Sequence, residues 1–564
     1  MPSSSPQPNL FAAGGAAALS LRFWLLLPLV GIGGGLGGGV LLLLLHATQH
    51  LAWAYRSGTF LGAVQQTSAV HRVAVLAAAG LVVGVYRWLT ASGPGGHGGE
   101  LAEAIWFRSG RVPPLSTTVR SVLSIVVVGL GASLGREAAP KQFGAAVASA
   151  LAGWVGLSPP ERRLLAACGA GAGIAAVYNV PLGGGLFALE VLLGVLALPF
   201  VLPAITASVI GTGVSWLLLP DVPTFSVPSY GISTAATVWA VLAGPVLGLA
   251  AAGYIRLIAW ADARKPAGWL RLVAPVAVFL NLGVVAIVLP QLLGNGKNVV
   301  QQAFLGHVAL PLLLVLTALK PVATAACLGS GAPGGLFMPT LSFGALLGGV
   351  LGALWASLWP GAPVGSYAIV AAGAMLAAST AGPLSALVLI AELMHRVDTL
   401  MVPLMLAVGG AVLVARLVEP RSIYSARIHS GKALARERTP LRTTGFDDLV
   451  SDRYRVVSAA APLVELLGDI IRCGIDSAPA VFVVDEAGRL AGVISPEQLS
   501  RRAESPLLLE TATAGDLAKP VTPVPSTADR AAILARLDGG NDAALPVVDA
   551  ASGRPVGVAK RGGR

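Results

Sequence analysis

The chain has 564 residues, of which 55% are hydrophobic and only 12% are charged, and its mean hydropathy is +0.76. This composition excludes a soluble globular protein and is typical of a polytopic membrane protein. The formal net charge of +11 does not indicate a nucleic-acid partner, because Lys and Arg are spread over several loops, as in the cytoplasmic loops of membrane proteins, rather than gathered into one stripe.

The membrane-spanning part begins after a short N-terminal segment. Residues 1–22 lack the basic leader, short apolar core and cleavage site of a removable signal, so we expect a cytoplasmic segment. Phe23–Leu45 is the first stretch that reaches the roughly 20 residues needed to cross a bilayer. Further apolar stretches follow as far as residue 418, and several are too short to cross alone. With 70 Gly and 39 Pro in the chain, they predict an all-α membrane domain with broken, partly re-entrant helices.

A glycine-rich segment, Gly131–Pro140, opens one of these helices and contains a single carboxylate, Glu137. A helix N-terminus presents unpaired N–H groups and a positive dipole end, and is therefore a ready anion site. Glu137 is itself an anion on a tether, so it would compete with a diffusing anion. The alternative is a glutamate that only caps a helix, but ionisable residues inside a membrane are usually functional. We predict that Glu137 gates an anion path, which opens by protonation or by rotation of the side chain.

This helix start recurs in the second half of the chain. Gly331–Pro339 lies 200 positions after it, and a second segment, Gly171–Glu190, recurs 202 positions later as Gly373–Glu392. The positions shared by the first pair are Gly131, Ala132, Gly135, Phe143, Gly144 and Ala145 against Gly331, Ala332, Gly335, Phe343, Gly344 and Ala345. The chain is therefore an internal duplication, with repeats at about 23–230 and 231–432. Matching interrupted segments in two halves indicate a binding site between the repeats.

The composition changes after Val418. From about residue 440 to 564 the chain is polar and mixed, with strand-like runs at Ala480–Val484 and Ala544–Val548 and helical runs between them. The pattern around Asp485 is repeated around Asp549. This part is predicted to be a small soluble α/β tandem repeat.

Four motifs resemble those of the CLC family of chloride channels and proton-coupled chloride exchangers. They are Gly135–Glu137, Asn179–Glu190, Gly329–Pro339 and Ser422–Ser425. The resemblance extends from about Phe23 to Lys432, and the tail is similar to the paired CBS domains that many members carry. It implies two inverted repeats of broken helices at 23–432, a CBS pair at 440–564, and a homodimer in which each subunit has its own path for chloride or a similar small anion.

The resemblance also implies roles for individual residues. Glu137 would be the gate, the hydroxyl of Tyr424 would bind the central anion, and the N–H groups of Leu336 and Phe337 would help to hold it. Neutral donors suit this task, because an anion must be able both to enter and to leave. The full set of implied anion-binding residues is Gly135, Arg136, Gly335, Leu336, Phe337 and Tyr424, with His97 and Gly98 in an outer selectivity loop. Pro94 is the alternative to His97 in that loop.

The chain departs from the family pattern at Val191. Exchangers usually carry a proton-transfer glutamate at this position, and valine cannot relay a proton. We therefore favour a passive chloride channel. The alternatives are a proton-coupled chloride antiporter and, in another class, a CBS-based sensor or interaction protein.

Other ionisable residues receive structural interpretations. Glu190 and Glu392 occupy matching places in the repeats and are expected at helix ends, whereas Lys141 and Lys320 are expected to extend toward the membrane surface. In the tail, Gln498 stands where CBS pairs carry a ribose-binding acid, which argues against adenine-nucleotide binding.

No metal-ligand spacing and no paired nucleophile and base occur, so we expect no enzyme and no cofactor. We expect an integral protein of a bacterial inner membrane, in contact with the lipid bilayer, with a cytoplasmic tail.

Overall fold

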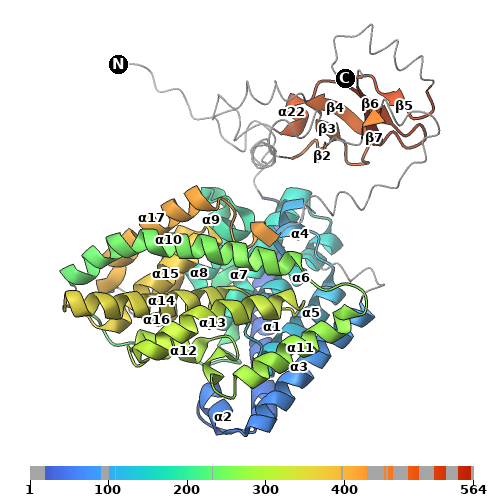
Figure 1. Ribbon diagram of the computed structural model, residues 1–564. Coiled ribbons are helices and arrows are strands. Elements are labelled where there is room, and N and C mark those ends of the chain that lie inside the picture. Colours follow the sequence, from blue (N-terminus) through green and yellow to red (C-terminus); the bar gives the residue numbers. More distant parts are fainter. Residues whose placement is uncertain are drawn as a thin grey trace, which may run out of the picture. The chain divides into compact units, whose positions relative to one another are not determined.

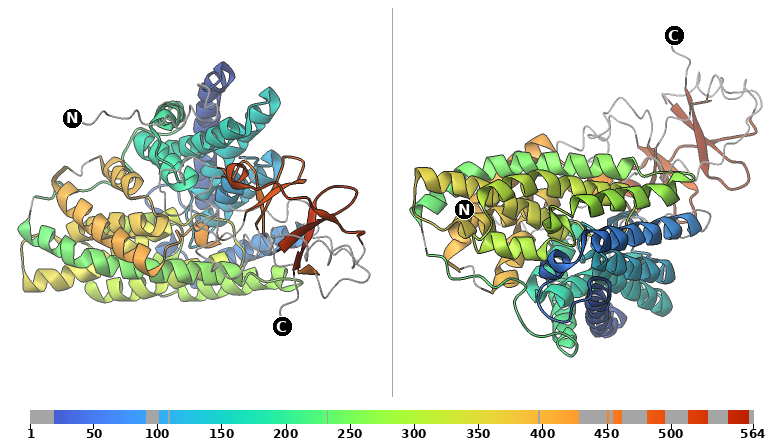
Figure 2. Two further views of the ribbon diagram at one scale, coloured as in Figure 1. Left: turned by 90° about the horizontal axis from the view of Figure 1, so that it is seen from above. Right: turned by 60° about the horizontal axis from the view of Figure 1, so that its bottom comes forward.

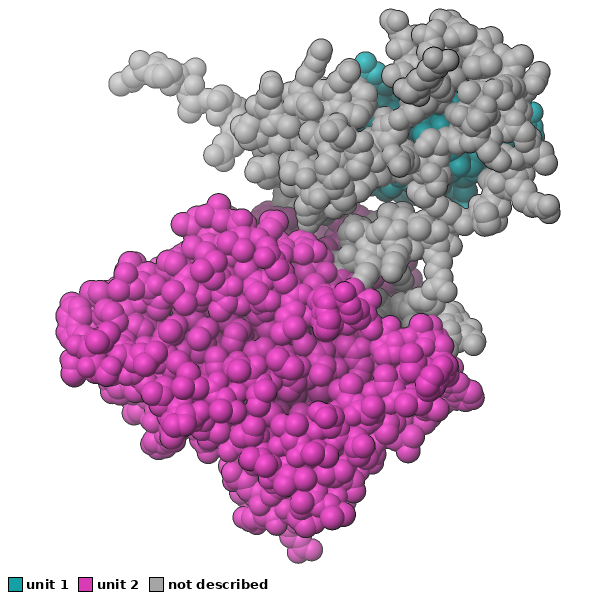
Figure 3. Space-filling view, in the orientation of Figure 1, with its two compact units in different colours: residues 1–18, 429–564 teal, residues 19–428 magenta. Residues whose placement is uncertain are grey.

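The computed structural model divides the chain into two compact units, Leu19–Ile428 and a second unit made of Met1–Ala18 and His429–Arg564 (Figure 3). The residues that it describes are 19–90, 101–107, 110–231, 233–395, 398–427, 450–451, 455–461, 481–494, 513–528 and 544–560. The larger unit is helical, and the strands all lie in the smaller one.

The first half of the larger unit contains nine α-helices and one π-helical turn among its described residues. They are α1 (Leu21–Trp53), α2 (Phe60–Gln66), α3 (Ala69–Leu89), α4 (Leu101–Phe107), α5 (Pro114–Gly129), α6 (Ala138–Val155), α7 (Pro159–Tyr178), α8 (Pro181–Phe187), η1 (Ala188–Leu193) and α9 (Leu198–Ser215). The second half follows with α10 (Thr234–Ala263), α11 (Leu270–Val285), η2 (Pro290–Leu292), α12 (Lys297–Phe304), α13 (Leu310–Gly329), α14 (Phe337–Leu358), α15 (Val364–Thr380), α16 (Pro383–Met394), η3 (Asp398–Leu400), α17 (Met401–Val418) and η4 (Ser425–Arg427).

Seven helices of the described part are long and apolar enough to cross a membrane: α1, α3, α9, α10, α13, α14 and α17. Between them lie shorter apolar helices, including α5, α11, α15 and α16. The predicted mixture of spanning and broken helices is therefore confirmed. α1 continues well beyond Leu45, as far as Trp53, whose indole N–H donates to the carbonyl of Gly129 at 3.1 Å. This tertiary contact anchors the end of the helix.

The two halves lie side by side, and α3 of the first half packs against α11 of the second (Figures 1 and 2). Equivalent helices have equivalent neighbours in the two halves. In the first half α6 packs on α7 and α7 on α9, and in the second half α14 packs on α15 and α15 on α17. The halves join at the two glycine-rich helix starts. Gly135 and Gly335 exchange two backbone hydrogen bonds of 2.8 Å each, as in an antiparallel bridge. The duplication in the sequence thus becomes a pairing of equivalent residues in space.

A second reciprocal contact between the halves involves the equivalent glutamates. The carboxylate of Glu190 accepts hydrogen bonds from the N–H groups of Leu384 and Ser385, at 3.1 and 2.6 Å, at the start of α16. Glu392 accepts from Leu182 and Gly183, at 2.9 and 2.7 Å, at the start of α8. Each glutamate satisfies helix N–H groups of the other repeat, which have no partner within their own helix. The predicted structural role at a helix end is confirmed for both.

Lys320 does not extend to the membrane surface, and that prediction is wrong. Its side chain is buried, and its ammonium group donates to the carbonyl oxygens of Leu292 and Gly294, at 2.9 and 3.2 Å. These carbonyls belong to the last residue of η2 and to the turn that leads from η2 to α12. Buried carbonyl groups outside regular structure require a donor, and Lys320 supplies it from α13.

The smaller unit contains two sheets and one short helix, α22 (Ala514–Leu517), among its described residues. One sheet has the order β2 (Arg455–Ser458), β3 (Val481–Val484), β4 (Leu490–Ile494), and the other has the order β1 (Val450–Ser451), β7 (Pro555–Lys560), β6 (Ala544–Val548), β5 (Val524–Pro525). β3 pairs parallel with β2 and antiparallel with β4, and β6 pairs in the same way with β5 and β7. The predicted strands and their tandem repetition are confirmed.

Candidate anion-binding site

The carboxylate of Glu137 lies at the N-terminus of a helix from the other repeat. Glu137 is the residue immediately before α6, and its side chain is only 2% exposed. Its Oε1 accepts a hydrogen bond of 2.6 Å from the N–H of Phe337, the first residue of α14. The pairing of Gly135 with Gly335 holds the two helix starts together. The carboxylate therefore occupies the kind of position in which a helix N-terminus would hold a free anion.

Tyr178, which the sequence analysis did not single out, also binds this carboxylate. It ends α7, and its hydroxyl donates to Oε2 of Glu137 at 3.0 Å. Its ring lies 5.4 Å from that of Phe337, and the guanidinium of Arg136 lies 4.8 Å from the centre of the tyrosine ring. The available signal was a phenol at the end of a helix whose second half is mostly Ala and Gly, immediately before the motif that starts at Asn179.

The two glycines at the bridge leave the space that the carboxylate fills. A Cβ atom at Gly135 or at Gly335 would meet the side-chain oxygens of Glu137. Neither residue has the positive φ that would demand glycine by itself. Glycine is therefore required here by the close approach of the side chain.

Tyr424 lies in the segment that follows α17. It is buried, and its ring meets that of Phe187 edge to face, with 6.1 Å between the ring centres. The N–H of the preceding residue, Ile423, donates to the carbonyl of Ser379 in α15 at 2.7 Å. The tyrosine is therefore positioned by contacts with both repeats.

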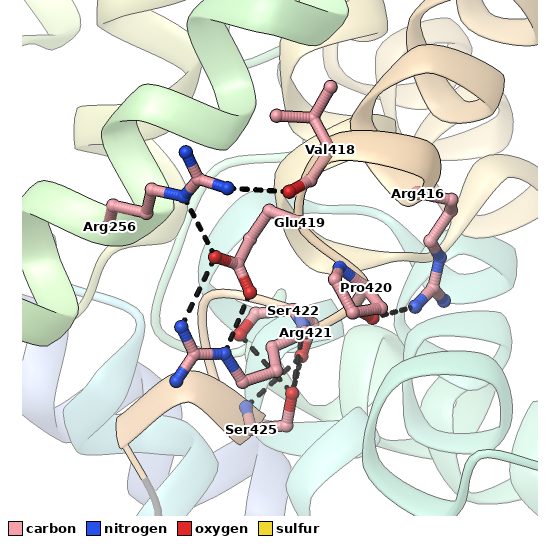
Figure 4. Close-up of polar contacts among 8 residues, drawn as sticks. All are labelled: Arg256, Arg416, Val418, Glu419, Pro420, Arg421, Ser422 and Ser425. Carbon is pink, nitrogen blue, oxygen red and sulfur yellow. Dashed lines mark hydrogen bonds and ion pairs between the residues drawn. The ribbon is translucent and has the colours of Figure 1, made fainter. Parts of the chain in front are cut away.

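An ion cluster holds the start of this segment (Figure 4). Glu419 accepts hydrogen bonds from the guanidinium groups of Arg421, at 2.7 Å, and of Arg256 in α10, at 3.1 Å. Arg256 also donates to the carbonyl of Val418, which ends α17, at 2.6 Å. The hydrogen bond from Arg421 lowers the pKa of Glu419, so this carboxylate stays charged at neutral pH. The cluster ties the end of α17 to α10.

Lys141 does not extend to the membrane surface, in contrast to the prediction. Its side chain is 5% exposed, and its ammonium nitrogen lies 4.6 Å from the centre of the Tyr424 ring and 5.8 Å from that of Phe187. Lys141 is in the first turn of α6, whose first residues are all buried. A side chain that starts from a buried turn between two repeats has no path along a lipid-facing surface.

The remaining candidate residues divide into two groups. Val191 lies in η1 and is buried, with a methyl group directed toward Gly382. Leu336 is buried and stands immediately before α14. His97, Gly98 and the alternative residue Pro94 lie outside the described residues. Their assignment to a selectivity loop stays a prediction.

Comparison with known proteins identifies the family. A family model described as "Voltage gated chloride channel" matches residues 75–416, which is more than half of the chain. The chain belongs to the voltage-gated chloride channel family. This is the CLC family that the four motifs resemble, and the matched range contains Glu137 and Phe337 together with the bridge that joins the two repeats.

Relatives of this CLC protein include both channels and exchangers by name. The voltage-gated ClC-type chloride channel ClcB of Salmonella dublin is 31% identical over 396 residues, which are 67% of this chain and 93% of that protein. The H(+)/Cl(−) exchange transporter ClcA of Vibrio parahaemolyticus is 29% identical over 319 residues, 54% of this chain and 67% of that protein. A solved structure of a slow cyanobacterial Cl−/H+ antiporter matches with a TM-score of 0.65 and 20% identity, over 74% of this chain and 99% of that one. The fold is that of CLC transporters, and the function is CLC-type chloride transport across a membrane.

Removing the hydroxyl of Tyr178 is expected to weaken the hold on the carboxylate of Glu137, the predicted gate. Tyr178→Phe deletes one hydrogen bond to a buried carboxylate, a contribution of about 1.5–3 kcal/mol, while the ring keeps its contacts with Phe337 and Arg136. We expect chloride efflux from liposomes at neutral pH to rise at least about tenfold, since about 1.4 kcal/mol corresponds to a factor of ten.

The matched control for this prediction is Tyr230→Phe. The hydroxyl of Tyr230 is also buried, but it donates to the carbonyl of Phe304 and has no contact with Glu137. This variant is expected to lose thermal stability without a rise in flux. Equal flux from Tyr178→Phe and the parent protein would show that the hydroxyl does not hold the gate.

Proposed function

We propose that this CLC protein is a passive chloride channel whose path is gated by Glu137. The observation that carries the proposal is the hydrogen bond of 2.6 Å from the N–H of Phe337 to the carboxylate of Glu137. A carboxylate in this position competes with chloride for the N-terminus of α14. Protonation removes its charge and rotation removes its oxygens, and either change frees the N–H for chloride. Deeper in the path, the hydroxyl of Tyr424 and the helix starts near Gly135 and Leu336 hold the anion.

Passive conduction is supported by the surroundings of Val191. The side chain is buried and cannot carry a proton. The adjacent carboxylate, Glu190, is a poor substitute, because both of its oxygens accept hydrogen bonds from the start of α16. These two hydrogen bonds hold the carboxylate in place at the start of α16, whereas a proton carrier must be free to move toward its acceptor.

The second candidate function is proton-coupled chloride exchange. It is favoured by the relative from Vibrio parahaemolyticus, which is named an exchange transporter. In this case protons would have to reach Glu137 from the inner side by a route that avoids Val191.

The deciding experiment measures the reversal potential of the purified protein in liposomes under a fixed chloride gradient. For a passive channel we expect about 59 mV per tenfold chloride gradient, the value for a single charge, and no change when a pH gradient is added. Empty liposomes serve as the control. A reversal potential that moves with the pH gradient would establish coupling and reject the channel proposal.

We further propose a homodimer in a bacterial inner membrane with a cytoplasmic CBS pair as its tail. The support for the dimer and the membrane is the family membership and its bacterial relatives. The support for the CBS pair is the repeated unit of one parallel and one antiparallel strand pair. If the protein is instead a CBS-based sensor or interaction protein, its function depends on residues 440–564 and is abolished when they are removed. The transport proposal predicts that chloride flux persists without these residues.

A further inference from the structure

The turn that carries Tyr424 is closed by two serines, one on each side of it (Figure 4). The N–H of Ser425 donates to the Oγ of Ser422 at 3.1 Å, and the N–H of Ser422 donates to the Oγ of Ser425 at 2.8 Å. The carbonyl of Ser422 also accepts a hydrogen bond of 2.9 Å from the N–H of Ala426. This reciprocal pairing has the geometry of a capping box, with a second serine in place of the usual Glu or Gln. Tyr424 therefore lies inside a closed ring of hydrogen bonds that fixes its backbone angles.

Two ion pairs with α10 hold the segment that contains this turn. Before the turn, Glu419 pairs with Arg256 at 3.1 Å, and after it, Arg427 pairs with Asp262 at 3.0 Å. Both members of the second pair are buried. On α10 the basic residue comes first and the acidic one second, whereas on the segment the acidic residue comes first. The two pairs together therefore fix the register of the segment along α10.

The register of the segment does not by itself fix the turn. The ion pairs act at residues 419 and 427, on either side of Tyr424, whereas a binding group must be held within about 0.5 Å of its working position. Close to Tyr424, the N–H of Ile423 donates to the carbonyl of Ser379 at 2.7 Å, and the serine pair closes the turn. The serine pair thus acts at the residue whose side chain the proposed function uses.

We propose that Ser422 and Ser425 are positioning residues of the central anion site, because their reciprocal hydrogen bonds set the position of the Tyr424 hydroxyl. This inference rests on the proposed function, which assigns the central anion to that hydroxyl, and neither serine binds the anion itself. Loss of one serine hydroxyl releases a backbone N–H, so the turn can adopt other backbone angles. The phenol oxygen lies at the far end of a long side chain and moves further than the backbone does. Chloride then binds more weakly.

The test measures the Kd for chloride of the purified full-length protein by titration calorimetry. The background is Glu137→Gln, so that the carboxylate does not compete with chloride. In this background Ser425→Ala is expected to raise the Kd about fivefold, the factor that corresponds to the loss of one N-terminal cap. Ser425 is half-buried, so Ser425→Thr has room for its extra methyl group and keeps the hydroxyl. It is expected to hold the Kd within about twofold of the background.

A double-mutant cycle shows whether Ser425 acts through Tyr424. Tyr424→Phe removes only the hydroxyl and keeps the ring. When Ser425→Ala is added to the protein that carries both Glu137→Gln and Tyr424→Phe, we expect no further change in the Kd, because no hydroxyl remains to be positioned. A general loss of packing would weaken chloride binding by the same factor whether or not the hydroxyl is present.

The matched control is Ser68→Ala at the start of α3. The hydroxyl of Ser68 accepts a hydrogen bond of 3.2 Å from the N–H of His71, so this variant also removes a serine cap, but in another helix. It is expected to lower thermal stability and to leave the Kd for chloride unchanged. Thermal unfolding of each variant verifies its folding, and Ser422→Ala is measured in the same way if Ser425→Ala does not fold.

The outcomes separate this inference from the proposed function. If Tyr424→Phe raises the Kd but folded Ser425→Ala or Ser422→Ala protein does not, the positioning role is overturned and the assignment of the anion to Tyr424 stands. A Kd that Ser425→Ala raises by the same factor with and without the Tyr424 hydroxyl also overturns the positioning role. If Tyr424→Phe leaves the Kd of the Glu137→Gln protein unchanged, the assignment of the anion to Tyr424 fails, and this inference fails with it.

Discussion

Chloride flux through the Glu137→Gln protein is expected to be about tenfold higher at neutral pH than flux through the parent and independent of pH. Glutamine keeps the size of the side chain but removes its charge. Hydrogen bonds to a charged acceptor are roughly twice as strong as neutral ones, so a loss of about 1.5 kcal/mol in the closed conformation is reasonable. Flux through the parent should rise as the pH falls, because protonation of Glu137 has the same effect as the substitution.

Chloride efflux from liposomes over the range from pH 7.5 to pH 4.5 checks this prediction. Glu392→Gln is the matched control, because its carboxylate also binds helix N–H groups but caps α8 instead of meeting the start of α14. This control should lower thermal stability and keep the pH dependence of the parent. If the parent and Glu137→Gln show the same flux throughout the pH range, Glu137 is not the gate.

The substitution Gly335→Ala is expected to reduce flux at least tenfold when it is made in the Glu137→Gln background. The Cβ atom of residue 335 would lie where an oxygen of Glu137 lies in the closed conformation. In the parent, the flexible glutamate could move aside. With the gate already weakened, the added methyl group instead obstructs the space that chloride must occupy at the start of α14.

Flux measurements on Glu137→Gln with and without Gly335→Ala check this second prediction. Gly153→Ala in α6 is the matched control, because a Cβ atom there meets no neighbouring atom within 4 Å. It should leave flux and stability unchanged. Undiminished flux through the double variant would place the chloride path away from the Gly135–Gly335 bridge.

The main features of the fold are visible in the sequence. Hydropathy fixes the membrane class, since a helix in lipid must be apolar over its exposed surface. The recurrence of Gly131–Pro140 at Gly331–Pro339 predicted a site between two repeats, and the structure brings Gly135 and Gly335 into direct contact. This site could be predicted from one segment, because the electrostatic properties of a glycine-rich helix start with a carboxylate depend on that segment alone.

The contacts of the buried side chains could not be predicted from the sequence. Lys141 and Lys320 have the same local signature, a lone cation in an apolar helix. From this signature, both were predicted to extend toward the membrane surface. In the structure one lies over Tyr424 and the other binds the carbonyl groups of Leu292 and Gly294. What distinguishes them is the segment opposite each lysine, which is distant in the chain.

By itself, the sequence determined the membrane class, the duplication, the glutamate at the helix start and the helix-end role of Glu190 and Glu392. Each of these depends on residue types and spacing within one segment or on comparison of two segments. Only the tertiary structure decided that Tyr178 and Phe337 hold the carboxylate of Glu137 and that Lys141 is buried beside Tyr424. These contacts join residues up to 283 positions apart, and their geometry follows from how the two repeats pack, which no local pattern encodes.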